Sequence, residues 1–107
     1  MLVKMGVDYS RLEKPIRRAL SVVDNVFKSI TGKEAVLTST YEGDHMAGSL
    51  HYANLAVDFR LRDLDAAVKD DIRLAVKDKL SQRYGLLKYD VLFSAQDTAL
   101  HVEYDPK

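Results

Sequence analysis

The chain contains no cysteine, no long apolar run and no excess of charge of either sign. Without cysteine there is no disulfide and no thiolate ligand, so any metal site must use histidine, aspartate or glutamate. No apolar run approaches the ~20 residues that a membrane-spanning helix requires, so no membrane span is expected. The segment 1–6 lacks the apolar region of a signal peptide, which predicts synthesis in the cytoplasm without an export signal.

The charge and length of the chain limit its organisation and its partners. Sixteen basic and sixteen acidic residues cancel, so there is no overall field to hold a nucleic acid, and no nucleic-acid partner is expected. A chain of 107 residues has room for one core, which predicts a single domain over 1–107. The apolar fraction of 47% and the charged fraction of 30% are ordinary for a globular protein. We expect a monomer.

Apolar residues recur at steps of three and four between residues 12 and 30, which predicts an amphipathic helix. Ser10 and Glu13 have the spacing of a capping box, and Pro15 indicates that the regular helix begins close to it. Gly32 follows the last apolar position and is typical of a helix end.

A second helix is predicted between Asp63 and Tyr84, where the apolar stripe is the clearest in the chain. Asp63 is expected to be its N-cap, and Gly85 is expected to end it. The many charged residues of this segment predict a solvated outer face.

Four segments have the alternation or the β-branched content of strands. These segments lie between and after the two helices. They cover residues 34–40, 55–61, 86–94 and 100–105. The order helix, strand, loop, strand, helix, strand, strand predicts an α+β fold, a small largely antiparallel sheet with helices packed on one face.

Two of these strands place polar side chains on the face opposite their apolar residues. In residues 55–61, Asp58 alternates with the apolar side chains and lies on the other face. In the last strand, His101, Glu103 and Asp105 share the face that the apolar residues leave free. The sequence therefore predicts a sheet with one face covered by helices and potential ligands on the other face.

His51 and Asp58 lie seven residues apart, and His101 closes the chain's last strand. Two imidazoles and one carboxylate are a suitable ligand set for a catalytic Zn²⁺, which keeps its fourth position open. Such a spacing also arises by chance, and a lone histidine is more often a hydrogen-bonded structural residue. Spacing alone therefore leaves both interpretations open.

The pattern Ser-x-His-Tyr-x-x-x-Ala-Val-Asp at residues 49–58, followed by a histidine in a strand near the C-terminus, adds a resemblance. It resembles the D-Ala-D-Ala carboxypeptidase/Hedgehog-type zinc peptidase family, which includes bacterial DD-carboxypeptidases, DD-dipeptidases, many phage endolysins and the zinc-binding part of Hedgehog domains. The resemblance covers residues 38–105 and implies a Hedgehog/DD-peptidase-like fold.

By this resemblance, Zn²⁺ is bound by His51, Asp58 and His101. Ser49 is implied to contact the substrate or to support the ligands. His45 matches a histidine that some members of the family hold near the reacting water, where it could hydrogen-bond a developing oxyanion. The family usually has glycine at the position of Asn54, and asparagine is the next most tolerant residue of a left-handed backbone.

The position of the general base departs from the family. Members carry an acid three residues, or a histidine two residues, before the second histidine, where this chain has Thr98 and Ala99. The nearest acids are Asp97 and Glu103, and we favour Asp97 because the family's base comes from the preceding loop. Glu103 is the other candidate, and a cross-strand salt bridge with Arg60 is an equally good interpretation of it.

The resemblance implies hydrolysis of a peptide bond next to a D-amino acid in the stem peptide of peptidoglycan. In such enzymes the metal polarises the carbonyl and lowers the pKa of water, and a carboxylate transfers the proton to the leaving amine. A phage endolysin or lysis protein acting on the cell wall is expected, with an intracellular bacterial peptidase as the competing account. A zinc-stabilised Hedgehog-like binding module without turnover is the alternative function, and a metal-free structural domain is the third.

Overall fold

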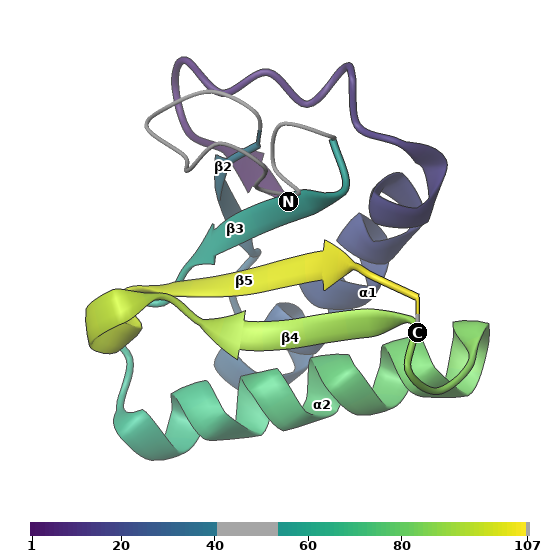
Figure 1. The fold of residues 1–107 in the computed structure, drawn as a ribbon. Coiled ribbons are helices and arrows are strands. Elements are labelled where there is room, and N and C mark those ends of the chain that lie inside the picture. The colour runs from purple at the N-terminus through teal and green to yellow at the C-terminus, as the bar shows by residue number, and fades with distance from the viewer. Residues whose placement is uncertain (41–53, 107) are drawn as a thin grey trace.

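Two helices and five strands form an α+β fold with a mixed sheet (Figure 1). The computed structural model describes residues 1–40 and 54–106. The elements are β1 (Leu2–Val3), α1 (Lys14–Thr31), β2 (Val36–Ser39), β3 (Ala56–Arg60), α2 (Ala66–Tyr84), β4 (Tyr89–Phe93), the short 3₁₀ helix η1 (Ala95–Asp97) and β5 (Ala99–Tyr104).

The helix α1 begins and ends close to where the sequence predicts. Pro15 lies in its first turn, and Gly32 ends it with φ 76° and an N–H that donates to the Lys28 carbonyl at 3.0 Å. The predicted capping box is wrong, because the N-cap is Glu13 and no side chain caps the helix. The Ser10 N–H instead donates to Asp8 Oδ1 at 2.8 Å, a turn that precedes the helix.

The N-cap of the helix α2 lies two residues later than predicted. It is Asp65, whereas Asp63 has φ 70° and lies in the left-handed region. An N-cap residue needs an extended backbone, so the prediction of Asp63 as the cap is wrong. The end at Gly85 is confirmed, and its N–H donates to the Ser81 carbonyl at 3.0 Å.

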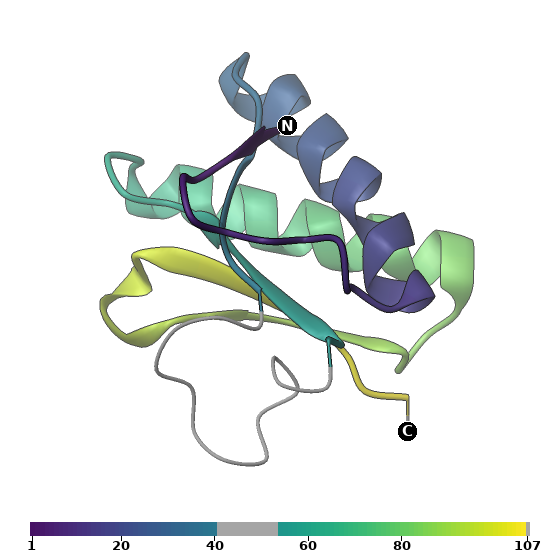
Figure 2. The ribbon, with the colours of Figure 1, turned by 90° about the horizontal axis from the view of Figure 1, so that it is seen from above.

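The sheet has the strand order β1-β2-β3-β5-β4. The pairs β2–β3, β3–β5 and β5–β4 are antiparallel, and only β1–β2 is parallel, so the largely antiparallel sheet is confirmed. The sequence did not predict β1, because two residues are too few for an alternation to show. Both helices lie on one side of the sheet (Figure 2).

The core fills the space between the helices and one face of the sheet. Strands β3 and β5 lie inside the sheet, and their core side chains Val57, Phe59, Leu100 and Val102 are fully buried. The largest fully buried side chains are Phe59, Leu12, Ile16, Leu37, Leu61, Ile72, Leu80 and Leu100. Asp58, His101 and Glu103 occupy alternate positions on the opposite face, beside the small and buried Ala56.

Within residues 1–40 and 54–106, no helix is both long enough and apolar enough to cross a membrane.

Candidate metal centre

Asp58 and His101 meet on the face of the sheet that the helices leave uncovered. Asp58 of β3 and His101 of β5 are direct cross-strand partners in the antiparallel register. Their side chains therefore project from neighbouring positions on one face. Asp58 Oδ1 and His101 Nδ1 lie 2.8 Å apart.

Glu103 contacts the other nitrogen of the same imidazole ring. It lies two residues after His101 in β5, so both side chains point to the same face. His101 Nε2 and Glu103 Oε1 are 2.9 Å apart. Because each ring nitrogen faces a carboxylate oxygen, the doubly protonated imidazolium, which donates from both nitrogens, satisfies both contacts.

The two carboxylates favour the protonated form of His101. The hydrogen bond to Asp58 raises the pKa of His101 above its ordinary value of 6.5, partial burial opposes this, and Glu103 adds to the increase. The three side chains retain between 18% and 21% of their exposed surface. The three side chains are therefore partly shielded from solvent, which strengthens the electrostatic interactions between them.

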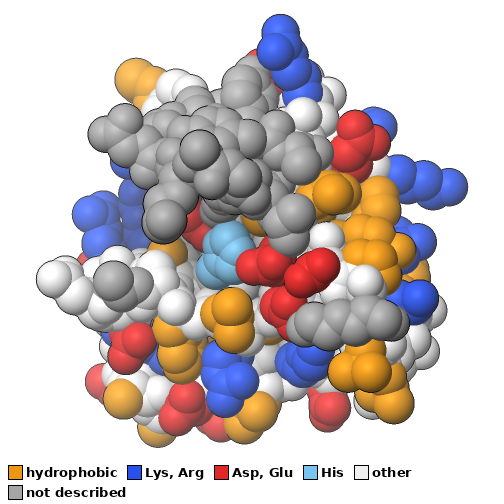
Figure 3. All heavy atoms as spheres, viewed as in Figure 1, with side chains coloured by type: hydrophobic (Ala, Val, Ile, Leu, Met, Phe, Trp, Pro, Cys, Tyr) orange, Lys and Arg blue, Asp and Glu red, His pale blue; other side chains and the backbone are white. Residues whose placement is uncertain are grey.

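The space-filling view shows this arrangement on the molecular surface (Figure 3). A pale-blue histidine side chain and red acidic side chains lie side by side on the face that the view shows.

A second group of acids adjoins the histidine through Glu103. Oxygen atoms of Asp90, Glu103 and Asp105 lie within 4.8 Å of one another, a grouping that could hold a metal ion. Asp90 of β4 is the cross-strand partner of Glu103. All three offer only oxygen, which suits a hard cation such as Ca²⁺ or Mg²⁺ rather than zinc.

The site residues predicted from the sequence do not include Asp90, although the sequence carries a signal for it. Tyr89, Val91 and Phe93 alternate in β4, which assigns Asp90 and Leu92 to the opposite face. What the sequence does not contain is the register that aligns Asp90 with Glu103, because pairing between strands depends on the whole sheet.

The structure brings together two of the three predicted zinc ligands. Asp58 and His101 are in contact, as described above. The third predicted ligand, His51, lies outside the described residues, as do the predicted catalytic residue His45 and the predicted substrate-contacting residue Ser49. Their roles stay predictions.

The two base candidates occupy different places. Asp97 is exposed at the end of η1, in the connection between β4 and β5, and its carbonyl accepts a hydrogen bond from Lys69 Nζ at 2.8 Å. Ala99 and His101 alone are separated by about 7 Å at the usual rise of a strand, and Asp97 lies beyond Ala99. Glu103, in contrast, contacts the imidazole directly.

The alternative interpretation of Glu103 as a partner of Arg60 is wrong. The register places Glu103 opposite Ala56, whereas Arg60 lies opposite Ala99 at the other end of the pair. Glu103 is paired with His101 instead.

Asp58 and His101 fit two of the ligand positions of a zinc site. An imidazole nitrogen and a carboxylate oxygen bound to the same tetrahedral Zn²⁺ lie about 3.3 Å apart, given metal–ligand distances of about 2.0–2.1 Å. Asp58 Oδ1 and His101 Nδ1, at 2.8 Å, would need to separate only slightly once the proton between them has left. Glu103 on the opposite ring nitrogen matches the carboxylate that commonly orients a metal-binding histidine.

The predicted left-handed conformation at Asn54 is confirmed, with φ 60°. Its carbonyl accepts a hydrogen bond from the Glu13 N–H at 3.0 Å, which ties the start of β3 to the start of α1. Asn54 Oδ1 is buried and has no hydrogen-bond partner within the described part of the chain.

Comparisons with protein-family models, with curated proteins and with solved structures found no match to this chain.

Proposed function

We propose that this chain is a zinc-dependent peptidase that hydrolyses a D-amino-acid-containing peptide bond of peptidoglycan stem peptides. The observation that carries the proposal is the contact between Asp58 Oδ1 and His101 Nδ1 on the face of the sheet opposite the helices. The substrate class rests on the resemblance of the motif at residues 49–58 to the zinc peptidase family. As a phage lysis protein, the chain would act on the bacterial cell wall.

In this proposal Asp58, His101 and His51 hold the metal. Zinc, when bound, supplies the Lewis acid that polarises the scissile carbonyl and activates water. Asp58 contributes an anionic oxygen, and His101 must give up the proton on Nδ1 before that nitrogen can bind.

Glu103 is a positioning residue in this arrangement. Its hydrogen bond keeps a proton on Nε2 and fixes the plane of the ring, so that Nδ1 is the nitrogen directed at Asp58. A carboxylate that holds an imidazole in this way is poorly placed to take a proton from water as well. Asp97 stays the proposed general base, and His45 the proposed donor to the oxyanion.

A second function, a zinc-stabilised binding module without turnover, is favoured by the positions of the two acids. Glu103 is engaged with His101, and Asp97 lies at the far end of the β4–β5 connection. Of the two base candidates, the one beside the ligand pair is therefore engaged with the imidazole, and the other lies away from the pair.

Metal analysis followed by a cell-wall assay separates these possibilities. The purified chain is expected to hold one zinc per molecule, and Asp58→Asn is expected to lose it while the matched control Asp90→Asn keeps it. A protein that binds no zinc after incubation with the metal would overturn both functions.

Turnover is tested by the loss of turbidity of purified cell walls, with and without a chelator. The peptidase is expected to clear walls only when zinc is present, and Asp97→Asn is expected to abolish clearance with zinc retained. Zinc-loaded protein that clears no wall chemotype would support the binding module and contradict the peptidase.

A further inference from the structure

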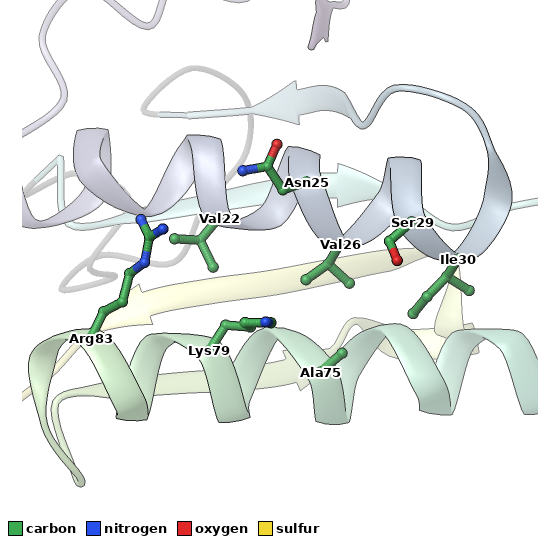
Figure 4. A pocket seen from close by; sticks show the side chains of 8 residues that line it. All are labelled: Val22, Asn25, Val26, Ser29, Ile30, Ala75, Lys79 and Arg83. Carbon is green, nitrogen blue, oxygen red and sulfur yellow. The ribbon is translucent and has the colours of Figure 1, made fainter.

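A groove runs along the seam between α1 and α2. Figure 4 shows this groove with both helices in front of the strands. The groove encloses about 320 Å³, close to the lower limit for a small-molecule site. Its side chains divide by chemistry. Lys79 and Arg83 of α2 are cationic, and Asn25 and Ser29 of α1 are neutral and polar. The apolar side chains are Val22, Val26 and Ile30 of α1 and Ala75 of α2.

The two cations give the groove a positive charge that the described residues do not neutralise. Lys79 and Arg83 are four residues apart on α2, so their like charges repel each other. No acidic residue lines the groove, and neither cation forms an ion pair within the described part of the chain. Arg83 extends from α2 toward α1 beside Val22, and Lys79 lies along the seam (Figure 4).

The apolar part of the groove continues away from Arg83. Ile30 lies at the opposite end, and Val26 and Ala75 lie between the two ends (Figure 4). Val22 and Ile30 are separated by eight residues of α1, or about 12 Å along its axis. Ile30 keeps 37% of its surface exposed, so covering it would bury apolar area that the fold leaves in water.

We propose that this groove binds an aliphatic carboxylate of medium chain length. The carboxylate lies between Arg83 and Lys79, where the planar guanidinium can donate two hydrogen bonds to it. The chain lies over Val26, Ala75 and Ile30. This binding is separate from the proposed peptidase function, because Asp58 and His101 lie on the face of the sheet opposite the helices and the groove lies in the helix layer.

The test is a titration of the full chain with octanoate, followed by ¹H–¹⁵N NMR spectra. We expect saturable shifts confined to residues 22–30 and 75–83, weaker binding of octan-1-ol and no saturable effect of acetate. The double variant Lys79→Gln/Arg83→Gln should weaken octanoate binding about tenfold, and Arg62→Gln, an exposed cation outside the groove, should leave it unchanged.

A second variant tests the apolar part. Ala75→Leu fills the seam and is expected to abolish octanoate binding, with circular dichroism confirming that the helices are retained. The proposal is overturned if octanoate shifts scatter over the whole surface, if octylammonium binds as tightly as octanoate, or if the two-cation variant binds as the parent does. Because both cations are exposed, that variant tests the proposal even where Ala75→Leu disturbs folding.

Discussion

In the metal-free protein the imidazole of His101 lies between two carboxylates, and the effect of this arrangement is measurable as the pKa of His101. Asp58 and Glu103 each accept from one ring nitrogen, so the pair stabilises the cation. The raised pKa adds folding stability that is fully present below the unfolded pKa of about 6.5. That stability is lost as pH rises through the folded value, when the ring loses a proton.

We predict that NMR titration of the metal-free chain gives His101 a pKa above 6.5. Asp58→Asn should lower this pKa more than Glu103→Gln does, because the hydrogen bond to Asp58 is the largest cause of the shift. A His101 pKa at or below 6.5 in the metal-free parent would contradict the contacts described here.

Asn54 carries two unfavourable features at one position. Its backbone is left-handed, and its amide oxygen is buried without a partner in the described part of the chain. Glycine adopts this backbone without a Cβ and removes the buried oxygen.

Asn54→Gly is therefore predicted to increase the free energy of unfolding by about 0.5–1 kcal/mol, measured by urea denaturation. Asn54→Val is the matched contrast and should lower it, because a β-branched residue is strained at positive φ. Equal destabilisation by both substitutions would show that the Asn54 side chain itself supports the fold.

At the scale of elements, Asp24 joins α1 to the start of β2. It is buried in α1, where Oδ1 accepts the Ala35 N–H at 3.0 Å and Oδ2 accepts from Lys28 Nζ at 3.0 Å. Burial alone would raise the pKa of Asp24, but the hydrogen bonds from Lys28 and Ala35 outweigh it and hold the pKa below its ordinary value.

Asp24→Asn is predicted to cost about 1–3 kcal/mol of unfolding free energy at pH 7, because it removes a charged acceptor from a buried donor. A lowered carboxyl pKa contributes stability above the unfolded value of about 3.9 and loses it as pH falls through the folded value. The difference between parent and variant should therefore shrink below about pH 4, as followed by urea denaturation at several pH values. A difference that stays constant down to pH 2 would exclude the carboxylate as its cause.

The elements that could be predicted from the sequence are those that local patterns define. The apolar stripes gave both long helices, and alternation gave the faces of β3 and β5, including the placement of Asp58 and His101 opposite the core. The helix caps predicted at Ser10 and Asp63 were wrong, because short polar side chains also form turns outside helices. The alignment of Asp90 with Glu103 could not be predicted, because register belongs to the assembled sheet.

For the whole molecule, a ligand that binds only the folded state must stabilise it by mass action. Zinc at a hundredfold excess over its dissociation constant is predicted to add about 2.7 kcal/mol to the unfolding free energy. Thermal denaturation with and without zinc measures this gain.

Asp58→Asn should abolish the zinc-dependent gain, whereas Asp90→Asn should preserve it. Glu103→Gln is expected to weaken zinc binding by about 10–100-fold, the usual effect of removing a carboxylate that orients a histidine ligand. A gain lost in Asp90→Asn and kept in Asp58→Asn would assign the metal to the neighbouring oxygen cluster instead.

The pairing of β3 with β5 has a consequence for how the chain unfolds. Asp58 and His101 are 43 residues apart in sequence, and the whole of α2 and β4 lies between them. A cation bound by both side chains would link the two ends of this long segment. While the cation stays bound, unfolding would therefore release less conformational entropy. Amide protons of the two central strands would then exchange with solvent last when the metal is present, and noticeably sooner after it is removed.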